Sequence, residues 1–262
     1  MDDGYQALLS FFRTNDRCAI AFSGGVDSTL LLHAALTADA DVRAYYIRSI
    51  FQPAWEYEDA VLYAKAMDVP FTVLSLDMLA YPKIIQNNKK RCYYCKHAIL
   101  TCLISRARSD GYPLLLDGTN ASDDMNDRPG MQALDELSII SPLRLCGLTK
   151  NEIYSLSSKF GLPSASKPAY SCLATRIPYG RAINSDLLSR VESAEKLLFS
   201  YGFSDFRVRL EGEDALLQFS QVDRERFYQQ RDTLVPKLQA WFYEIQVDVD
   251  LRKGTGVWTN GN

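Results

Sequence analysis

A glycine-rich turn between a short apolar run and a helix-like segment most constrains how this chain can fold. The turn reads Ser-Gly-Gly-Val-Asp-Ser at residues 23–28; apolar residues 18–22 precede it, and a mainly apolar segment at 29–36 follows it. This order is typical of a buried strand, a tight turn and a helix. Because glycine has no Cβ, the backbone can turn sharply there and approach a ligand closely. The sequence therefore predicts a strand–turn–helix unit that holds a ligand at its turn.

The expected helix start suits an anionic ligand such as phosphate. Unpaired N–H groups and the helix dipole at a helix N-terminus both attract negative charge. Hydroxyl groups in the turn add donors, and Asp27 is a candidate ligand for a magnesium ion that itself binds phosphate. The turn is not a Walker P-loop, because no Gly-Lys-Ser/Thr follows at the required spacing. The candidate binding residues of the turn are Ser23, Gly24, Gly25, Asp27 and Ser28.

Strand-like and helix-like segments alternate over the first 160 residues. Strands are expected at 18–22, 42–47, 71–76 and 113–120, with a further short strand at 139–143. Helices are expected at 5–14, 29–36, 55–67, 99–107 and, opened by a capping box at 149–152, up to about residue 160. Such alternation implies parallel pairing in a doubly wound α/β sheet. Ligands of these sheets bind at the carboxyl ends of the strands, where residues 23–28 lie.

The pattern changes after residues 161–180, which show no periodicity. A loop of this length without regular secondary structure more often has a function than not in a compact chain. Beyond it we expect a helix at 186–201, strands at 206–210 and 215–219, a helix at 223–242 and a strand at 243–251. We therefore predict an α/β domain at 1–177 and a small α+β domain at 178–262.

Composition narrows the class of protein. The net charge of −3 offers no electrostatic argument for a nucleic-acid partner. No apolar run is long enough to span a bilayer, and the acidic first residues do not resemble a signal peptide, so a cytoplasmic protein with no membrane partner is expected. Six cysteines in such a chain indicate core residues, metal ligands or reactive thiols more than disulfides.

Three cysteines have surroundings suited to chemistry. Cys92 and Cys95 form a Cys-x-x-Cys among basic residues, and Cys172 lies in the long loop near Arg176. Nearby positive charge lowers the pKa of a thiol. A Cys-x-x-Cys is typical of half a zinc site, a redox dithiol or part of an iron–sulfur site, and core packing is the simpler alternative. No second Cys-x-x-Cys completes a zinc site, whereas three thiolates would suit a four-iron cluster with one iron left open. Apolar neighbours indicate core positions for Cys18, Cys102 and Cys146.

Two arginines alternate along an expected strand. Arg207 and Arg209 are two residues apart, so both point to one face. Two adjacent guanidiniums repel each other unless they meet an anion, and arginine pairs suit planar phosphate or carboxylate groups. An anionic ligand is one interpretation, and surface pairing with Glu211 or Asp214 is the other. His33 lies within an apolar helix and is expected to be structural.

Taken together, these segments resemble the LarE family, ATP-dependent sulfur transferases of nickel-pincer nucleotide synthesis within the PP-loop ATP pyrophosphatase superfamily. The turn at 23–28 marks only the superfamily; the Cys172 loop and the Arg-x-Arg are more specific. The matching pieces are Ser-Gly-Gly-Val-Asp-Ser at 23–28, Leu-Asp-Gly-Thr-Asn at 116–120, Asp-Asp-Met-Asn-Asp-Arg-Pro-Gly at 123–130, Lys-Pro-Ala-Tyr-Ser-Cys-Leu-Ala-Thr-Arg-Ile-Pro-Tyr-Gly at 167–180, Ala-Glu-Lys at 194–196 and Phe-Arg-Val-Arg at 206–209.

The resemblance implies that ATP and magnesium bind at residues 23–28 together with Gly118 and Arg128. The carboxylates of pyridinium-3,5-biscarboxylic acid mononucleotide would be adenylated, with release of pyrophosphate, and converted into thiocarboxylates. Family members form homo-oligomers, so the resemblance implies a homo-oligomer here as well. The phosphate or carboxylates of the substrate would be held by Arg176, Arg207 and Arg209.

The family divides by its source of sulfur. In members without the Cys-x-x-Cys, the loop cysteine that matches Cys172 gives up its own sulfur. In the members that this chain resembles more, three cysteines, here Cys92, Cys95 and Cys172, hold a [4Fe-4S] cluster whose open iron carries an extra sulfide. The cysteine pattern therefore favours delivery by a cluster, with sacrifice of Cys172 as the alternative.

Three other classes compete with this interpretation. A PP-loop tRNA thiolase also pairs such a turn with cysteines, but the net charge of −3 and the absence of a basic, aromatic-interleaved face count against it. An amide-forming synthetase of the same superfamily would need an ammonia source and no cysteine trio. A nucleotide-binding module without enzymatic activity would bind ATP and release no pyrophosphate.

Overall fold

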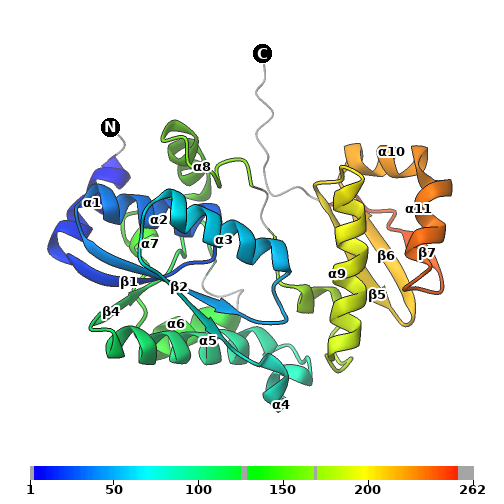
Figure 1. Cartoon of the computed structure of the whole chain (residues 1–262), viewed down its shortest axis with the longest axis horizontal. Helices are drawn as coiled ribbons and strands as arrows, with labels where there is room; N and C mark the ends of the chain where they lie inside the picture. The colour runs from blue at the N-terminus through cyan, green and yellow to red at the C-terminus, as the bar shows by residue number, and fades with distance from the viewer. Residues whose placement is uncertain (1–2, 125–128, 168–169, 253–262) are drawn as a thin grey trace. The chain divides into compact units, whose positions relative to one another are not determined.

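The computed structural model describes residues 3–124, 129–167 and 170–252. Its contacts divide the chain into two compact units (Figure 1). Unit 1 comprises residues 1–78 and 89–167, and unit 2 comprises residues 79–88 and 168–262. The chain therefore passes from one unit to the other after residues 78, 88 and 167.

Unit 1 is built on a parallel sheet of four strands in the order β3-β2-β1-β4. The strands are β1 (Arg17–Ala21), β2 (Asp41–Arg48), β3 (Phe71–Ser75) and β4 (Leu114–Leu116). The α/β class with parallel pairing, expected from the sequence, is confirmed. Because β2 and β4 lie on opposite sides of β1, the strand order reverses at β1, and loops on either side of this point can diverge around a ligand.

Helices cover both faces of this sheet. Figure 1 shows α2 and α3 on one side of the sheet and α5 and α6 on the other. The structure confirms the expected helices, and the capping box formed by Thr149 and Glu152 opens α8. The helices of unit 1 are α1 (Asp3–Thr14), α2 (Val26–Thr37), α3 (Ala54–Ala66), α5 (Arg91–Ser109), α6 (Pro129–Glu136), α7 (Pro142–Leu145) and α8 (Lys150–Lys159).

The core of unit 1 is centred on β1 and α2. Cys18, Ala19 and Ile20 of β1 are wholly buried, as expected of a parallel strand covered on both faces. Leu31 of α2 packs in the same cluster, and most of α2 is buried because the helix lies between the sheet and the outer helices α1 and α8. Each fully buried Leu or Ile contributes about 1.5–3 kcal/mol relative to an exposed one. This burial fixes the position at which α2 begins.

Unit 2 contains an antiparallel hairpin with a helix packed against it. β5 (Phe206–Glu211) pairs antiparallel with β6 (Asp214–Phe219), and β7 (Ile245–Val247) adds to β6 in parallel. Along β5 the burial alternates, so that Val208 and Leu210 face the core and the residues between them do not. Asn184 caps α9 (Ser185–Ser200), which contacts β5 (Figure 1). The remaining helices described for unit 2 are α4 (Pro82–Ile85), the 3-10 helix η2 (Leu173–Arg176), α10 (Gln221–Gln229) and α11 (Arg231–Leu238). The 3-10 helix η1 (Met78–Ala80) lies where the chain first passes from unit 1 to unit 2.

Three sequence expectations differ from the structure. The short strand expected at 139–143 is only a single bridge between Leu116 and Ile140, because Pro142 starts helix α7 directly afterwards. The helix expected at 223–242 is two helices separated at Gln230. Residues 229–233 are all polar, so apolar periodicity contains no signal for this break. The final strand expected at 243–251 is reduced to the three residues of β7, although the N–H groups of Asp248 and Arg252 still donate to the carbonyls of Leu217 and Phe219 at 2.9 Å.

No helix in the described part of the chain is both long and apolar enough to cross a membrane.

Aromatic rings surround the histidine of α2. The ring of His33 stacks on Phe160 with centroids 4.7 Å apart, and its Nδ1 lies 3.1 Å from the hydroxyl oxygen of Tyr5. Burial lowers the pKa of His33 from its ordinary value of 6.5. The expectation that His33 is structural agrees with this packing.

We expect His33 to make the stability of the protein depend on pH. The unfolded chain takes up a proton at His33 near pH 6.5, whereas the folded chain resists it, so the free energy of unfolding falls as the pH drops below about 6.5. Urea unfolding of the wild type and of His33→Gln at several pH values between about 5 and 8 measures this. The variant should lose part of this dependence. An unchanged slope in His33→Gln would contradict the argument.

Candidate functional site

The turn between β1 and α2 has the geometry expected from its glycines. Gly24 has a φ of +72°, and a Cβ on it would lie 3.1 Å from Cα and Cβ of Ala60 in α3. Within the turn, the hydroxyl group of Ser28 lies 3.2 Å from Oγ of Ser23 and donates to the carbonyl of Gly25. Gly25 is the N-cap of α2 and supplies no side-chain cap. The start of α2 therefore keeps the donor character that suits an anion.

Asp27 joins three segments that are far apart in the sequence. Its Oδ2 forms an ion pair with Nζ of Lys150 at 2.5 Å, and its Oδ1 accepts a hydrogen bond from Nδ2 of Asn120 at 3.1 Å. Lys150 begins α8, and Asn120 follows β4. Asp27 and Lys150 remain partly exposed, whereas Asn120 is buried. A carboxylate, an ammonium and an amide thus meet at the carboxyl end of the sheet.

The loop after β4 packs directly on the start of α2. A Cβ on Gly118 would lie 3.1 Å from the backbone nitrogen of Ser28 and 3.2 Å from Cβ of Asp27, so only glycine fits without displacement. Gly118, which the family resemblance implies as a nucleotide ligand, is therefore placed beside the turn at 23–28. Its role in binding stays a prediction.

The buried carboxylate of Asp117 connects this loop to the cysteine-bearing helix. Its oxygens accept hydrogen bonds of 2.6 Å from the hydroxyl groups of Thr119 and Ser141. Nζ of Lys96 in α5 lies 3.5 Å from Oδ2 of the same carboxylate. Lys96 follows Cys95 directly, so the first turn of α5 is tied to the loop that packs on α2.

Cys92 and Cys95 lie at the start of α5. Residues three apart on a helix share a face, so the two thiols are neighbours there. Both are half-buried, and Nη2 of Arg91 donates to Sγ of Cys92 at 3.6 Å. The simpler interpretation, full burial in the core, does not apply to them. All six cysteines lie within the described residues and none forms a disulfide.

The remaining cysteines of unit 1 have the apolar character expected of them. Cys18 is wholly buried, and burial, assisted by Asp41 and Asp16, raises its pKa to about 12. Burial also raises the pKa of Cys102 and of Cys146, both half-buried. These three are neutral thiols near pH 7 and unsuited to act as nucleophiles.

Cys172 lies in unit 2, immediately before η2. Its carbonyl oxygen accepts hydrogen bonds from N and Oγ1 of Thr175, at 3.0 and 2.8 Å, which fixes the backbone at the cysteine. The thiol is half-buried. The two cysteine features therefore belong to different units. Within residues 3–124, 129–167 and 170–252, no three histidine, cysteine, aspartate or glutamate side chains gather as a metal site.

Arg176 is buried and fully engaged within unit 2. Its Nε forms an ion pair with Oε1 of Glu195 at 2.8 Å, and the side chains of both residues are at most 2% exposed. Its Nη1 donates to the carbonyl of Ser171 and to Oγ1 of Thr175. Glu195 also accepts from the hydroxyl group of Tyr170. The structure thus gives Arg176 a part in holding the Cys172 segment; the predicted contact with substrate stays a prediction.

Arg207 and Arg209 share one face of β5, as expected from their alternation. Burial, and then the charges of Arg252, Arg176 and Arg209, lower the pKa of Arg207 to about 10. Arg209 donates from Nε to Oε1 of Gln218 at 2.7 Å. Among the described residues, no carboxylate forms an ion pair with either guanidinium, so pairing with Glu211 or Asp214 is not seen there. The other two guanidiniums of this arginine cluster, those of Arg176 and Arg252, are paired with Glu195 and Asp205. Arg207 and Arg209 are half-buried without a carboxylate in ion-pair contact, which favours an anionic ligand.

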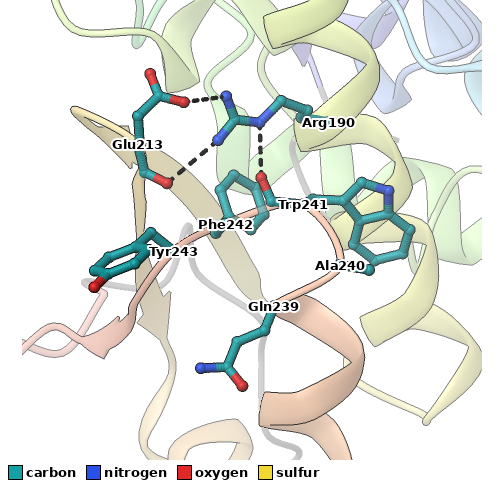
Figure 2. Close-up of a pocket in the computed structure, with 7 residues that line it drawn as sticks. All are labelled: Arg190, Glu213, Gln239, Ala240, Trp241, Phe242 and Tyr243. Carbon is teal, nitrogen blue, oxygen red and sulfur yellow. Dashed lines mark hydrogen bonds and ion pairs between the residues drawn. The ribbon is translucent and has the colours of Figure 1, made fainter.

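A pocket described for unit 2 is lined by residues other than these arginines. It has a volume of about 500 Å³ and is lined in part by Arg190, Glu213, Trp241 and Tyr243 (Figure 2). Figure 2 shows the guanidinium of Arg190 turned toward Glu213 and the carbonyl of Trp241, with Nη1 and Oε2 of Glu213 2.7 Å apart. This arginine is already paired, and none of the candidate site residues lines the pocket.

Sequence patterns did not indicate every residue of the site. Asn120, Lys150 and Glu195 take part through contacts between distant segments, and none was singled out from the sequence although each stood within a quoted motif. Lys96 stands among the basic residues beside the Cys-x-x-Cys. One candidate residue, Arg128, a predicted nucleotide ligand, falls at residues 125–128, which lie outside the described residues.

Comparison with known proteins shows relatives that are similar along most of the chain. No family model matches it. An uncharacterized protein of Synechocystis is 34% identical over 231 residues, covering 87% of this chain and 86% of the relative. An uncharacterized protein of Methanocaldococcus jannaschii is 27% identical over 90% of this chain and 91% of its own length. The pyridinium-3,5-bisthiocarboxylic acid mononucleotide synthase of Lactiplantibacillus plantarum is 29% identical over 89% of this chain and 85% of its own length.

These similarities run through both units and are not confined to the glycine-rich turn, because each covers at least 87% of the chain. The 34% identity to the Synechocystis protein establishes common family membership with that protein, and the 29% identity to the synthase of Lactiplantibacillus plantarum supports a LarE-like family. The chain belongs to the LarE-like family.

Proposed function

We propose that the protein is an ATP-dependent sulfur transferase that converts the carboxylates of pyridinium-3,5-biscarboxylic acid mononucleotide into thiocarboxylates. The observation that carries the proposal is the similarity, over 89% of this chain, to a relative named as the synthase of the bisthiocarboxylic acid mononucleotide. Two features of the structure support it: the phosphate-suited turn in unit 1 and the arginine cluster in unit 2.

Unit 1 supplies the site for ATP in this proposal. The N–H groups at the start of α2 and the hydroxyl groups of Ser23 and Ser28 bind the pyrophosphate portion. Magnesium is commonly held by one or two carboxylates together with substrate phosphates, and the partly exposed Asp27 fits this donor set. The substrate carboxylate attacks the α-phosphate, the bond to pyrophosphate breaks, and an acyl-adenylate forms. Activation is needed because a carboxylate oxygen is a poor leaving group, whereas AMP is a good one.

Asp27→Asn should abolish most substrate-dependent release of pyrophosphate from ATP. The amide keeps the shape but removes the charge that would bind magnesium and that pairs with Lys150, and we expect a loss of about 100-fold or more. Release of pyrophosphate is measured with ATP and the pyridinium substrate. The control is Asp68→Asn, on an exposed turn after α3 where a φ of +49° already suits asparagine. Equal rates in the wild type and Asp27→Asn would contradict the placement of the nucleotide.

Unit 2 supplies the anchor for the substrate. The arginine cluster, Arg176, Arg207, Arg209 and Arg252, carries positive charge. The substrate carries a phosphate and two carboxylates. An anion placed between Arg207 and Arg209 relieves their mutual repulsion and gains charge-assisted hydrogen bonds. Burial, and then neighbouring positive charge, lower the pKa of Arg207 and Arg209. A bound anion also offsets the effect of that positive charge.

Arg207→Ala and Arg209→Ala should each weaken binding of the pyridinium substrate. A charge-assisted pair contributes roughly 1.5–3 kcal/mol, which corresponds to about a 10- to 100-fold increase in KM for the substrate. The KM for ATP should change little. The control is Arg231→Ala, which removes an exposed arginine of α11. An unaltered substrate KM in both cluster variants would show that the anion binds elsewhere.

The source of sulfur is the finer part of the proposal. A [4Fe-4S] cluster would be held by Cys92, Cys95 and Cys172 and would supply the sulfide that replaces AMP on the activated carboxylate. Two half-buried thiols one helical turn apart suit two ligands of one cluster. Cys92 and Cys172 also lie within five residues of points where the chain passes between the units, after residues 88 and 167.

Cys92→Ala should lower the iron bound by protein prepared without oxygen and should end repeated turnover. Iron, acid-labile sulfide and product formed per chain are the measurements. Cys102→Ala, on the same helix and with a thiol whose pKa is raised by burial, is the matched control and should retain both properties. Repeated turnover in strictly anaerobic protein that contains no iron would overturn the cluster. A single turnover that leaves dehydroalanine at residue 172 would instead show sacrifice of that cysteine.

A further inference from the structure

The two carboxylate oxygens of Asp27 have partners of different kinds. Oδ1 accepts a hydrogen bond from the neutral amide of Asn120, whereas Oδ2 is paired with the ammonium of Lys150. The amide is fixed, because Asn120 is buried and its own Oδ1 accepts from the N–H of Ser122 at 2.9 Å. The side chains of Lys150 and Asp27 are 30% and 24% exposed, so solutes can reach the ion pair. The contact with Lys150 is therefore the one that a ligand can exchange.

Lys150 stands where a helix least favours positive charge. It is the first residue of α8, and the N-terminus of a helix carries partial positive charge of its own. The carboxylate of Glu152 does not offset this charge directly, because its Oε2 accepts from the backbone and the hydroxyl group of Thr149. Among residues 3–124, 129–167 and 170–252, Asp27 is the one carboxylate in ion-pair contact with Lys150. The ammonium thus depends on an anion at the turn that contains Asp27.

The ring of Tyr154 holds the ammonium near this turn without neutralising it. Nζ of Lys150 lies 5.3 Å from the centroid of the ring, within the range of a cation–π contact. Tyr154 is four residues after Lys150, one turn further along α8. An ammonium has three N–H donors, and in the described part of the chain its one hydrogen bond is to Asp27. Lys150 therefore keeps donors for a further anion.

A divalent cation and Lys150 compete for the same carboxylate. If Asp27 binds magnesium, the ammonium and the metal ion stand beside each other, and their repulsion is strong where water is partly excluded. Phosphate oxygens remove this conflict, because they attract both cations at once. The pyrophosphate portion of ATP is assigned to the turn at 23–28, in which Asp27 itself lies. A nucleotide there offers the ammonium a new anionic partner close to the one it loses.

We propose that Lys150 is a phosphate-binding residue whose ammonium occupies Asp27 while the nucleotide is absent. Entry of the magnesium-bound nucleotide transfers the ammonium from the carboxylate to phosphate oxygens. The pair thereby makes the site selective for a metal ion that arrives with phosphate over a metal ion alone. This inference rests on the proposed function, because that function places ATP and magnesium at Asp27. All of the residues involved lie in unit 1.

The test measures metal binding and nucleotide binding separately in the full-length protein. Manganese(II), which prefers the same oxygen ligands as magnesium, is the probe for the metal alone and is followed by its electron paramagnetic resonance. Lys150→Met keeps the length of the side chain and removes its charge and donors. Manganese should bind the nucleotide-free variant about fivefold more tightly than the wild type, the factor that corresponds to removing a partly exposed ion pair.

The same variant should bind the nucleotide more weakly. Calorimetry with magnesium and ATP should show a dissociation constant about 10- to 100-fold higher in Lys150→Met, because a charge-assisted hydrogen bond to phosphate is lost. Lys150→Arg keeps the charge and should restore most of the nucleotide affinity. Lys159→Met, which removes an exposed lysine in the last turn of the same helix, is the matched control and should change neither constant. If Lys150→Met does not fold, Lys150→Gln takes its place.

The two changes of opposite sign distinguish this role from a structural one. Weaker binding of both manganese and ATP in Lys150→Met would show that Lys150 only holds the site together, and would overturn the inference. Unchanged manganese binding, or unchanged ATP binding, would also overturn it.

Asp27→Asn separates a failure of the inference from a failure of the proposed function. This variant should lose manganese binding, because the carboxylate is gone. Equal manganese binding in Asp27→Asn and the wild type would overturn both the magnesium site of the proposed function and the competition with Lys150. Loss of binding in Asp27→Asn, together with wild-type behaviour of Lys150→Met, would overturn the inference alone.

Discussion

The close packing of the loop after β4 on the first turn of α2 is the constraint on which the site in unit 1 depends. Gly118 leaves no room for a Cβ against Ser28 and Asp27, so the loop and the helix start are held in one arrangement. Parallel strands place both at the same edge of the sheet, and the buried Asp117 fixes the loop through two short hydrogen bonds. Asp27, Asn120 and Lys150 meet there because this packing brings their backbones together.

The two units divide the chemistry of the proposed reaction between them. Unit 1 presents a helix start and a carboxylate, which suit a nucleotide and its magnesium ion. Unit 2 presents a half-buried set of guanidiniums, which suits an anionic substrate. The cysteines are distributed in the same way, with two at the start of α5 and one before η2. The chain passes between the units close to both cysteine features, after residues 88 and 167.

Much of the fold was readable from local patterns. The apolar run before residues 23–28, the capping box at α8 and the alternation along β5 each follow from the chemistry of neighbouring residues. The break at Gln230 was not readable, because the polar residues around it carry no period. Nor did any pattern indicate that residues 79–88 pack with the C-terminal unit. That association rests on Asn87 and on hydrogen bonds to backbone groups, which every residue type offers.

The sequence by itself determined the strand–turn–helix unit, the parallel α/β class of unit 1, the shared face of Arg207 and Arg209, and the family resemblance. These depend on residue type and on spacings of a few positions, where local geometry is fixed by the period of a helix or a strand. Only the tertiary structure decided that Arg176 is buried against Glu195, that Asp27 pairs with Lys150, and that Asn87 holds residues 177–181. Such contacts join segments separated by 19 to 123 positions, and the energy of a pair depends on burial that no local pattern reveals.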